Sequence, residues 1–486
     1  MRHLPVDPHT LLTLFTALPL VGLLLWVFAR HCGTAIGLLL GTQVWAVAAG
    51  GQTAALDIGV RVYPMDVLAV CALCVALVRL WRGGLTGHAG LLPLLTLVAL
   101  TGWSTLRGIA NFGLQAAGND SRVYFWYFLA IALYTATAPL GTSLSRIVTR
   151  AWLASAAAYA LLSLAGWAGR GLHSVTTRVT VDGVTVDPRP VPAGAALVLA
   201  QGAMLLLCPL VSASSTAGSS GHHPPTRTRQ ARGRSLLALL LLVLVALLQH
   251  RTVWVAAAAM AIAWWVLRPA RTGQRVASAI AGVTVLFSAV LLYSVGAFGA
   301  IGGALTDSFM ETQGTHSTFV WRVLGWQDLL NAPRSAAQWL FGAPFGSGYE
   351  RSIAGGLVTV SPHDYYLHVV LRLGLVGLGA LLVLYVLAWR RSVQAGSGTL
   401  ALRLAIIGQL VLFVAYSALP EQAVLLGLCL WQARVSAVGE RRQPSPGRLG
   451  ADTCTAETVL HTAAVVPRPS SVPDSVNAAP PSARSC

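Results

Sequence analysis

Lysine is absent from this sequence, and acidic residues are scarce. The 486 residues include 33 basic residues, all of them arginine, against 16 Asp and Glu, for a formal net charge of +17. Charged residues make up 10% of the chain and hydrophobic residues 55%, whereas a soluble domain carries about 25% charge. The composition therefore excludes an ordinary soluble domain and predicts an integral membrane protein.

Groups that would bind a metal ion are also lacking. No Asp-x-Asp pair occurs, and the acidic residues between Ala300 and Asp364 stand apart from one another. A hard cation beside phosphates generally needs one or two closely placed carboxylates. The pair Cys71 and Cys74 has CxxC spacing but lies within an apolar run, so we interpret it as two small apolar residues. We expect neither a metal nor another cofactor.

What the chain contains instead is a series of continuous apolar runs. About 20 apolar residues cross the hydrocarbon core as a helix, so we predict an all-α integral membrane fold with 12 to 13 transmembrane helices. The predicted spans lie at 11–28, 33–50, 66–80, 91–106, 123–139, 147–168, 191–211, 235–250, 252–267, 277–298, 368–388, 401–418 and 421–436.

Arginines in short links between the runs predict the orientation. They cluster at 227–234, 268–275 and 390–391, which fall on one side if the spans alternate. The positive-inside rule makes that side cytoplasmic. Because the arginines mark topology in this way, we do not expect a nucleic-acid partner.

The same phasing divides the chain into parts. We predict a polytopic membrane domain over 1–436 that contains one long extracytoplasmic loop at 299–367 and a cytoplasmic linker at 212–234. The tail at 437–486 is rich in Pro, Ser, Ala and Arg, a composition typical of disorder. The loop is the natural place for chemistry, because it gathers glycines, arginines and a histidine beside the membrane.

One helix is expected inside this loop. Apolar and polar residues alternate at helical spacing from Phe319 to Leu330, and Asn331-Ala-Pro333 ends the pattern. An amphipathic helix lying in the membrane interface is the simplest interpretation. Arg322 and Trp326 are four residues apart and share one face of it.

Three outward-facing residues are candidates for chemistry: Arg251, Arg322 and His363. Each has an ordinary alternative, since Arg251 could snorkel at a helix end, Arg322 could lie on a solvated face and His363 could cap a helix. Guanidinium groups bind phosphates bidentately, and a neutral imidazole accepts a hydroxyl proton near pH 7. Together they fit transfer from a lipid-linked diphosphate to a hydroxyl acceptor.

The order of these elements resembles the O-antigen ligase and polymerase superfamily of bacterial membrane glycosyltransferases. The resemblance spans most of residues 50 to 435 and is strongest over 245–390. The motifs that carry it are Arg107-Gly108, Asn119-Asp-Ser-Arg122, Arg251-Thr-Val-Trp254, Arg322 with Trp326, Gly346-Ser-Gly348-Tyr349, Pro362-His363-Asp364-Tyr365-Tyr366-Leu367 and Arg372-Leu-Gly374-Leu-Val-Gly377-Leu-Gly379.

The resemblance implies a C-type glycosyltransferase-like fold and an undecaprenyl-diphosphate glycan as donor. Arg251 and Arg322 would hold the diphosphate, and His363 would activate or orient the acceptor hydroxyl. The reaction would be metal-independent and inverting. Asp364 departs from the family, where Asn often follows the histidine. The secondary candidates are Asp364, Tyr366, Arg372, Gly346 and Gly348.

Several alternatives stay open at this point. The acceptor is a glycan or a lipid, so the chain could be a ligase or a polymerase of cell-surface polysaccharide or exopolysaccharide. Its further candidate partners are membrane lipids and polysaccharide-assembly proteins. The arginine bias indicates a GC-rich bacterium, and hence a multi-pass protein of the cytoplasmic (inner) membrane with its active site facing outside. A lipid-linked glycan transporter or flippase would instead show inverted repeats, which we do not find. A peptidoglycan polymerase would rely on an outer-loop carboxylate.

Overall fold

The computed structural model describes most of the chain outside the tail and parts of the links. The described residues are 8–50, 55–57, 61–83, 89–140, 143–171, 179–181, 184–186, 189–208, 226–268, 272–276, 280, 284, 318–353, 356–395 and 397–442. The chain divides into two compact units, Met1–Val438 and Gly439–Cys486. The fold described below is that of the first unit.

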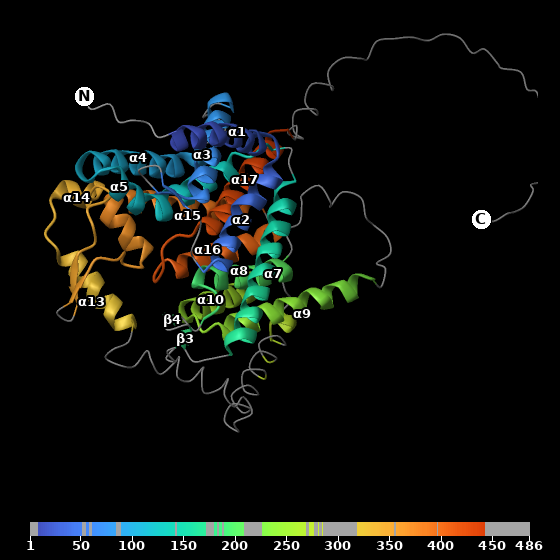
Figure 1. Cartoon of the computed structure of the whole chain (residues 1–486). Helices are drawn as coiled ribbons and strands as arrows, with labels where there is room; N and C mark the ends of the chain where they lie inside the picture. The colour runs from blue at the N-terminus through green and yellow to red at the C-terminus, as the bar shows by residue number, and fades with distance from the viewer. Residues whose placement is uncertain are drawn as a thin grey trace, which may run out of the picture. The chain divides into compact units, whose positions relative to one another are not determined.

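Helices make up nearly all of the described part of this unit (Figure 1). They are α1 (Pro8–Arg30), α2 (Cys32–Ala48), α3 (Pro64–Gly83), α4 (Leu92–Phe112), α5 (Leu114–Ser121), a π-helix (Arg122–Trp126), α6 (Tyr127–Ala136), α7 (Leu144–Arg170), α8 (Ala193–Leu207), α9 (Thr226–Leu247), α10 (Arg251–Leu267), α13 (Thr318–Asn331), α14 (Ala336–Phe341), α15 (Tyr365–Gln394), α16 (Leu400–Leu412), α17 (Pro420–Arg442) and short 3-10 turns at Ala89–Leu91 and Ser397–Thr399.

The strands form three small antiparallel hairpins in the links. β1 (Leu56–Asp57) pairs with β2 (Arg61–Val62), β3 (Val179–Val181) with β4 (Val184–Val186), and β5 (Arg351–Ile353) with β6 (Gly356–Val358). The registers place Asp57 opposite Arg61 and Arg351 opposite Val358. Each hairpin therefore shapes a link and contributes no layer to the fold.

The predicted all-α integral membrane fold is confirmed. By length and composition, five described helices can cross a membrane: α3, α4, α7, α9 and α15. Residues Leu18–Arg30 and Cys32–Ala48 pass the same test as a pair bent by 120°. The helices α8, α10 and α16 are apolar but shorter. Every predicted span on described residues coincides with a helix, and the one at 277–298 lies almost wholly outside them.

Two predicted boundaries fall inside helices. The predicted linker at 212–234 includes the first turns of α9, and α17 continues to Arg442, beyond the predicted domain end at 436. The remainder of the linker and residues 443–486 of the tail lie outside the described residues. Within the loop predicted at 299–367, the expected amphipathic helix is confirmed as α13.

Small residues let the central helices approach closely. Helix α8 is buried over most of its length and packs against α7, α9, α10 and α16. A Cβ at Gly202 would stand 3.0 Å from that of Ala156, and one at Gly427 would stand 2.6 Å from the carbonyl oxygen of Ala132. Such small-residue contacts are typical of helices that associate in a bilayer, where burial of apolar area gives little driving force.

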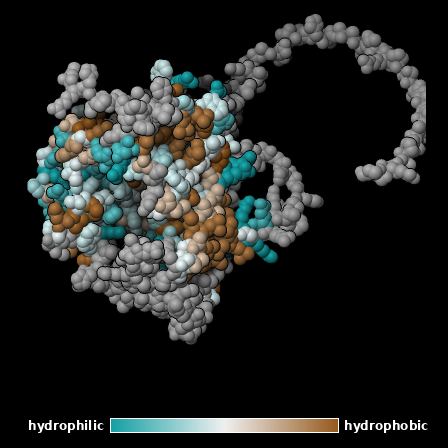
Figure 2. All heavy atoms as spheres, viewed as in Figure 1, coloured by the Kyte–Doolittle hydropathy of each residue, from teal (hydrophilic) through white to brown (hydrophobic). Residues whose placement is uncertain are grey.

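The outer faces of several helices are apolar. Leu23, Val70, Leu239 and Val383 belong to four different helices, and 49 to 58% of each residue's surface is exposed. Figure 2 shows hydrophobic residues over much of the visible face. An exposed surface of this kind is unfavourable in water, and it matches a protein that contacts lipid.

Helix α15 is broken at Gly374, which adopts φ +69° and ψ −170°. The break frees backbone carbonyls that a bilayer cannot satisfy. The backbone nitrogen of Ala343 donates to the carbonyl of Leu371 at 2.8 Å, and the Ser104 hydroxyl donates to that of Arg372 at 3.1 Å. Residues 365–373 therefore form a short half-helix held against α4 and the end of α14.

Glycine is required at this break for two reasons. Its positive φ strains any other residue, and a Cβ at Gly374 would stand 2.2 Å from the carbonyl carbon of Leu340. We predict that Gly374→Ala lowers the free energy of unfolding by roughly 2 kcal/mol or more, measured by denaturant unfolding in detergent.

Gly379→Ala is the matched control. Gly379 lies in the same helix, and a Cβ there would meet nothing within 4 Å. Alanine favours helix over glycine by about 1 kcal/mol, so this variant should be as stable as the parent or more so. Equal stability of both variants would show that the close packing at Gly374 is not needed.

Candidate functional site

The backbone just before His363 is held by side chains from the loop. Arg351 donates from Nη1 to the carbonyl of Val360 at 2.6 Å, and Trp326 donates from Nε1 to that of Pro362 at 2.7 Å. Trp326 comes from α13 and Arg351 from β5, and these two elements pack together. The amphipathic helix therefore helps to position the histidine.

His363 occupies an unusual backbone conformation at the start of α15. Its φ of +53° lies in the left-handed region, where His is more common than most residues other than glycine. Asp364 follows as the N-cap and accepts from the backbone nitrogen of Leu367 at 2.9 Å. The nitrogen of Tyr365 donates to the carbonyl of Phe413 at 2.8 Å. The turn at His363 is thus fixed between the loop and the end of α16.

The surroundings of His363 favour its neutral form. Partial burial lowers the pKa of the imidazole, and the nearby charges of Arg322 and Arg351 lower it further. Both effects disfavour the imidazolium because a buried or cation-flanked site penalises positive charge. A neutral imidazole has one nitrogen free to accept a proton near neutral pH.

Arg322 reaches the segment that follows α16. Its Nη1 donates to the carbonyl of Ala415 at 3.3 Å, and its guanidinium carbon lies 5.3 Å from the centre of the Tyr416 ring. The side chain is only partly buried, so part of its donor capacity remains for a ligand. Arg322 and His363 are therefore brought together beside residues 413–419.

The start of α10 is connected to the same segment through the residues that begin α8. Arg251 is the first residue of α10, and its neighbour His250 hydrogen-bonds through Nε2 to the carbonyl of Val191 at 2.8 Å. Gly194, three residues after Val191, packs closely against Leu419. A Cβ at Gly194 would stand 2.3 Å from Cδ1 of that leucine. Residues 413–419 thus link the start of α10 to Arg322 and His363.

A buried ion pair lies beneath the loop. Arg372 donates from Nε to Oδ2 of Asp120 at 2.8 Å, and only 2% of the Arg372 side chain and 9% of the Asp120 side chain are exposed. The Arg372 Nη2 donates to the carbonyl of Gly348 at 2.8 Å, and Nη1 contacts the Ser347 hydroxyl. The ion pair therefore joins α5, α15 and residues 346–349.

Further hydrogen bonds complete this cluster. The Tyr349 hydroxyl donates to Oδ1 of Asp120 at 2.5 Å and contacts Nε2 of His368, and the Gly346 nitrogen donates to Asp120 at 2.8 Å. Burial alone would raise the pKa of Asp120, but the partners His368, Arg372, Tyr349 and Gly346 outweigh it and hold that pKa below its ordinary value. The Asp120 carboxylate is therefore charged, and its contacts position Gly346, Tyr349 and Arg372.

The secondary candidates from the sequence make hydrogen bonds that stabilise the loop and α15. Gly346 and Gly348 have positive φ and bond to Asp120 and Arg372. The Tyr366 hydroxyl donates to the carbonyl of Leu410 at 2.9 Å. Asp364 caps α15, and burial raises the pKa of its carboxyl. In this structure all five make contacts that hold the loop and α15 in place.

Sequence reasoning missed Asp120 and His368 as members of this cluster, and it did not assign Arg351 to the histidine. One signal was available for Asp120. Charged residues buried in a membrane protein are paired, so Arg372 within an apolar span required an acidic partner among only 16 Asp and Glu residues. His368 carried no such signal, because a histidine on a helix face is compatible with many surroundings.

The described residues contain no group of three His, Cys, Asp or Glu side chains placed to hold a metal ion. The candidate site around His363 instead contains guanidinium groups, an imidazole and backbone carbonyls. Chemically, this arrangement can bind an anion and accept a proton from a neighbouring hydroxyl.

The fold and the site together define a multi-pass membrane protein with a cationic site around a neutral histidine. Residues 236–382 match the family model described as O-antigen ligase, a range that contains Arg251, Arg322 and His363. The resemblance to the O-antigen ligase and polymerase superfamily is therefore confirmed over this range, and it indicates glycan transfer of the ligase or polymerase type. A search of curated proteins finds no match.

The buried pair generates a stability prediction. Removing one partner leaves an uncompensated buried charge, so Asp120→Leu or Arg372→Met alone should lower the free energy of unfolding by about 3 kcal/mol or more. The double variant should lose less than the sum, with a coupling of roughly 1–3 kcal/mol, measured by a double-mutant cycle in detergent.

Asp66 and Arg122 provide a matched control pair. They are 3.7 Å apart, with 21% and 18% of their side chains exposed, so their cycle should give a coupling below about 1 kcal/mol. Additive losses for Asp120 and Arg372 would contradict the view that this pair acts as a unit.

Proposed function

We propose that this protein transfers or polymerises a glycan from an undecaprenyl-diphosphate donor to a hydroxyl acceptor at the outer face of the bacterial cytoplasmic membrane. The observation that carries the proposal is His363, kept neutral by burial and by Arg322 and Arg351. It lies within the range that matches the O-antigen ligase family.

Arg322 and Arg251 are assigned to the donor diphosphate. A guanidinium remains charged at any physiological pH and matches phosphate oxygens bidentately. Arg322 contacts segment 413–419 directly, and the start of α10 is connected to that segment through α8, which supports a common ligand. As the glycosidic bond breaks, negative charge grows on the leaving diphosphate, and preorganised arginines stabilise that charge.

His363 is assigned to the acceptor. The acceptor oxygen forms a bond to the anomeric carbon while the bond from that carbon to the diphosphate oxygen breaks. The imidazole takes the hydroxyl proton, and the diphosphate leaves with the electron pair. A single displacement of this kind inverts the anomeric centre and requires no metal ion.

The test is transfer in vitro, with purified protein in lipid and an undecaprenyl-diphosphate oligosaccharide as donor. His363→Asn should lower the rate by about 10²–10⁴-fold because the general base is lost, and Asn tolerates the left-handed backbone at this position. Arg322→Lys should lower it by about 10²-fold because bidentate contact with the leaving group is lost.

Arg334→Lys is the matched control for these variants. Arg334 follows α13 in the same loop and donates to the carbonyl of Leu330 at 3.3 Å, so the rate should be close to that of the parent. Full activity of His363→Asn and Arg322→Lys would refute the assignment, and loss of transfer in chelator would refute the metal-independent mechanism. Product length separates polymerase from ligase.

The pH dependence of transfer follows from the pKa of His363. The neutral imidazole is the active form, so the rate rises with pH through the pKa of this group and then levels off. Because that pKa is lowered, the acid limb should lie below the ordinary histidine value of about 6.5. Arg351→Gln removes one cation and should move the limb upward, measured from kcat/KM against pH.

Arg334→Gln should leave the limb in place, because Arg334 is not among the charges that lower the pKa of His363. The comparison separates a local charge effect from a general loss of positive charge in the loop. An acid limb that does not move in Arg351→Gln would mean that another group controls the rate.

A further inference from the structure

Three contiguous cavities share one side chain, Arg122. The first has a volume of about 450 Å³, the second about 290 Å³ and the third about 360 Å³, and Arg122 lines all of them. Volumes of this size are typical of sites for small molecules. Arg122 opens the π-helix between α5 and α6.

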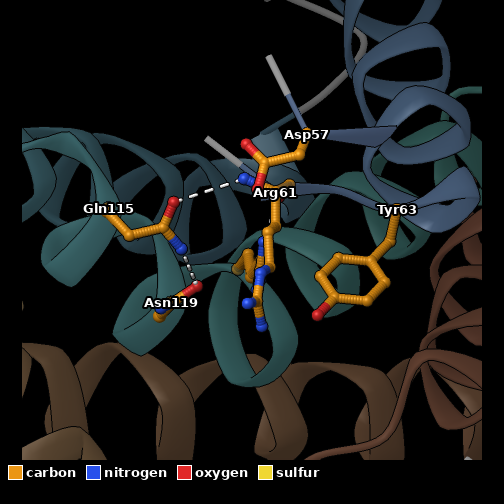
Figure 3. Close-up of a pocket in the computed structure, with 6 residues that line it drawn as sticks. Asp57, Arg61, Tyr63, Gln115 and Asn119 are labelled. Carbon is orange, nitrogen blue, oxygen red and sulfur yellow. Dashed lines mark hydrogen bonds between the residues drawn. The ribbon is translucent and has the colours of Figure 1, made fainter. Parts of the chain in front are cut away.

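The first cavity is lined entirely by polar and charged side chains and Tyr63. Figure 3 shows Gln115 and Asn119 on one helix, facing Asp57 and Arg61 of the first hairpin. Gln115 accepts from the Arg61 backbone nitrogen at 3.3 Å and donates to Asn119 at 2.9 Å. Amide, carboxylate and guanidinium groups beside an aromatic ring can bind the hydroxyls and faces of a sugar.

The second cavity has the opposite character. Apart from Arg122 and Asp66, it is lined by Ala69, Val70 and Leu73 of α3, by Trp126 at the end of the π-helix, and by Tyr127 and Ala130 of α6. Val70 is 58% exposed, and α3 and α6 pack together along this side. The cavity is therefore an apolar groove on a helix pair that faces lipid.

Arg122 is fixed at the junction of these two cavities. Its Nη1 donates to the carbonyl of Arg61 at 2.8 Å and lies 3.7 Å from Oδ2 of Asp66, and its guanidinium carbon stands 4.5 Å from the centre of the Tyr63 ring. The Arg61 side chain forms no hydrogen bond or ion pair with the described residues. Two guanidinium groups thus border the polar cavity, and a phosphate suits that position.

Helix α5 connects this site to the loop. Asn119 faces the polar cavity, and the next residue, Asp120, holds Gly346 and Tyr349. A Cβ at Gly346 would stand 3.0 Å from the backbone nitrogen of Ala117. The polar cavity and the loop are therefore separated by a single short helix, while Arg322 contacts Ala415 and Tyr416.

We propose that the cavities around Arg122 form one composite site for a lipid-linked glycan. The lipid chain would lie in the groove between α3 and α6, its phosphate at Arg122 and Arg61, and its first sugar against Gln115 and Asn119. This assignment rests on the proposed function, in which the site binds the acceptor. The acceptor is then a membrane-anchored lipid carrying phosphate and sugar, bound on the side of α5 that faces the first hairpin.

The test is the number of lipid-linked molecules bound per chain. A radiolabelled undecaprenyl-diphosphate oligosaccharide is titrated into the full chain in nanodiscs, in a His363→Asn background that prevents turnover. Two molecules should bind. Arg61→Gln with Arg122→Gln should weaken one site by about tenfold or more and leave the other unchanged, whereas Arg322→Gln should affect only the other.

Two matched control variants, Leu77→Trp and Arg82→Gln, test whether the effects are local to the cavities. Val70→Trp fills the groove and should remove the same molecule as the Arg61 and Arg122 variant, whereas Leu77→Trp, seven residues along the exposed face of α3, should not. Arg82→Gln removes an exposed arginine at the far end of α3 and should leave both sites intact. Excess phosphatidylglycerol should not displace the probe.

The outcomes separate the two proposals. One bound molecule that is lost only in Arg322→Gln would overturn this site and leave the proposed function standing. One molecule lost only in the Arg61 and Arg122 variant would support the site and overturn the donor assignment. Displacement by phosphatidylglycerol would show a general anionic-lipid site and overturn the inference, and no binding at all would overturn both proposals.

Discussion

The loop over the site depends on one buried ion pair, Asp120 with Arg372. Two opposite charges taken out of water are costly unless both are paired and hydrogen-bonded. Arg372 meets that condition by donating to Asp120, to the Gly348 carbonyl and to the Ser347 hydroxyl. The loop is therefore held in place because its carbonyl and hydroxyl groups accept hydrogen bonds from the Arg372 guanidinium. Without these acceptors the charge would be costly to bury in an apolar helix. The pair fixes residues 346–349 of the loop to both α5 and α15.

The break in α15 also depends on polar groups outside the helix. An unbroken helix would carry the chain through the membrane with its first turn far from the loop. Gly374 instead leaves a half-helix of residues 365–373, and the freed carbonyls of Leu371 and Arg372 are bonded by Ala343 and Ser104. Backbone groups at membrane depth must be satisfied internally, so the break is possible only where the loop supplies donors. The ion pair and the broken helix thus require each other, and His363 stands at the free end of the half-helix.

The sequence predicted the class of fold, the helix from Phe319 to Leu330 and the joint role of Arg322 and His363, because hydropathy and helical spacing are local properties. It could not predict that α15 is broken, since a glycine in an apolar run is equally compatible with a straight helix. It also could not pair Asp120 with Arg372 or assign Arg351 to His363, because these contacts join residues far apart in the chain. Arg372 is a secondary site candidate from the sequence, and its burial and its set of partners make it a positioning residue.

The absence of lysine is consistent with the electrostatics of the site. Arg322 and Arg351 both act on His363, and neighbouring cations in a partly buried site disfavour one another. An ammonium group in such surroundings readily loses its proton, whereas a guanidinium keeps its charge. A lysine here would share the titration with the histidine, and the charge available to an anion would change with pH. Two guanidinium groups instead leave the imidazole as the group that titrates between them, so anion binding and proton acceptance are carried by different side chains.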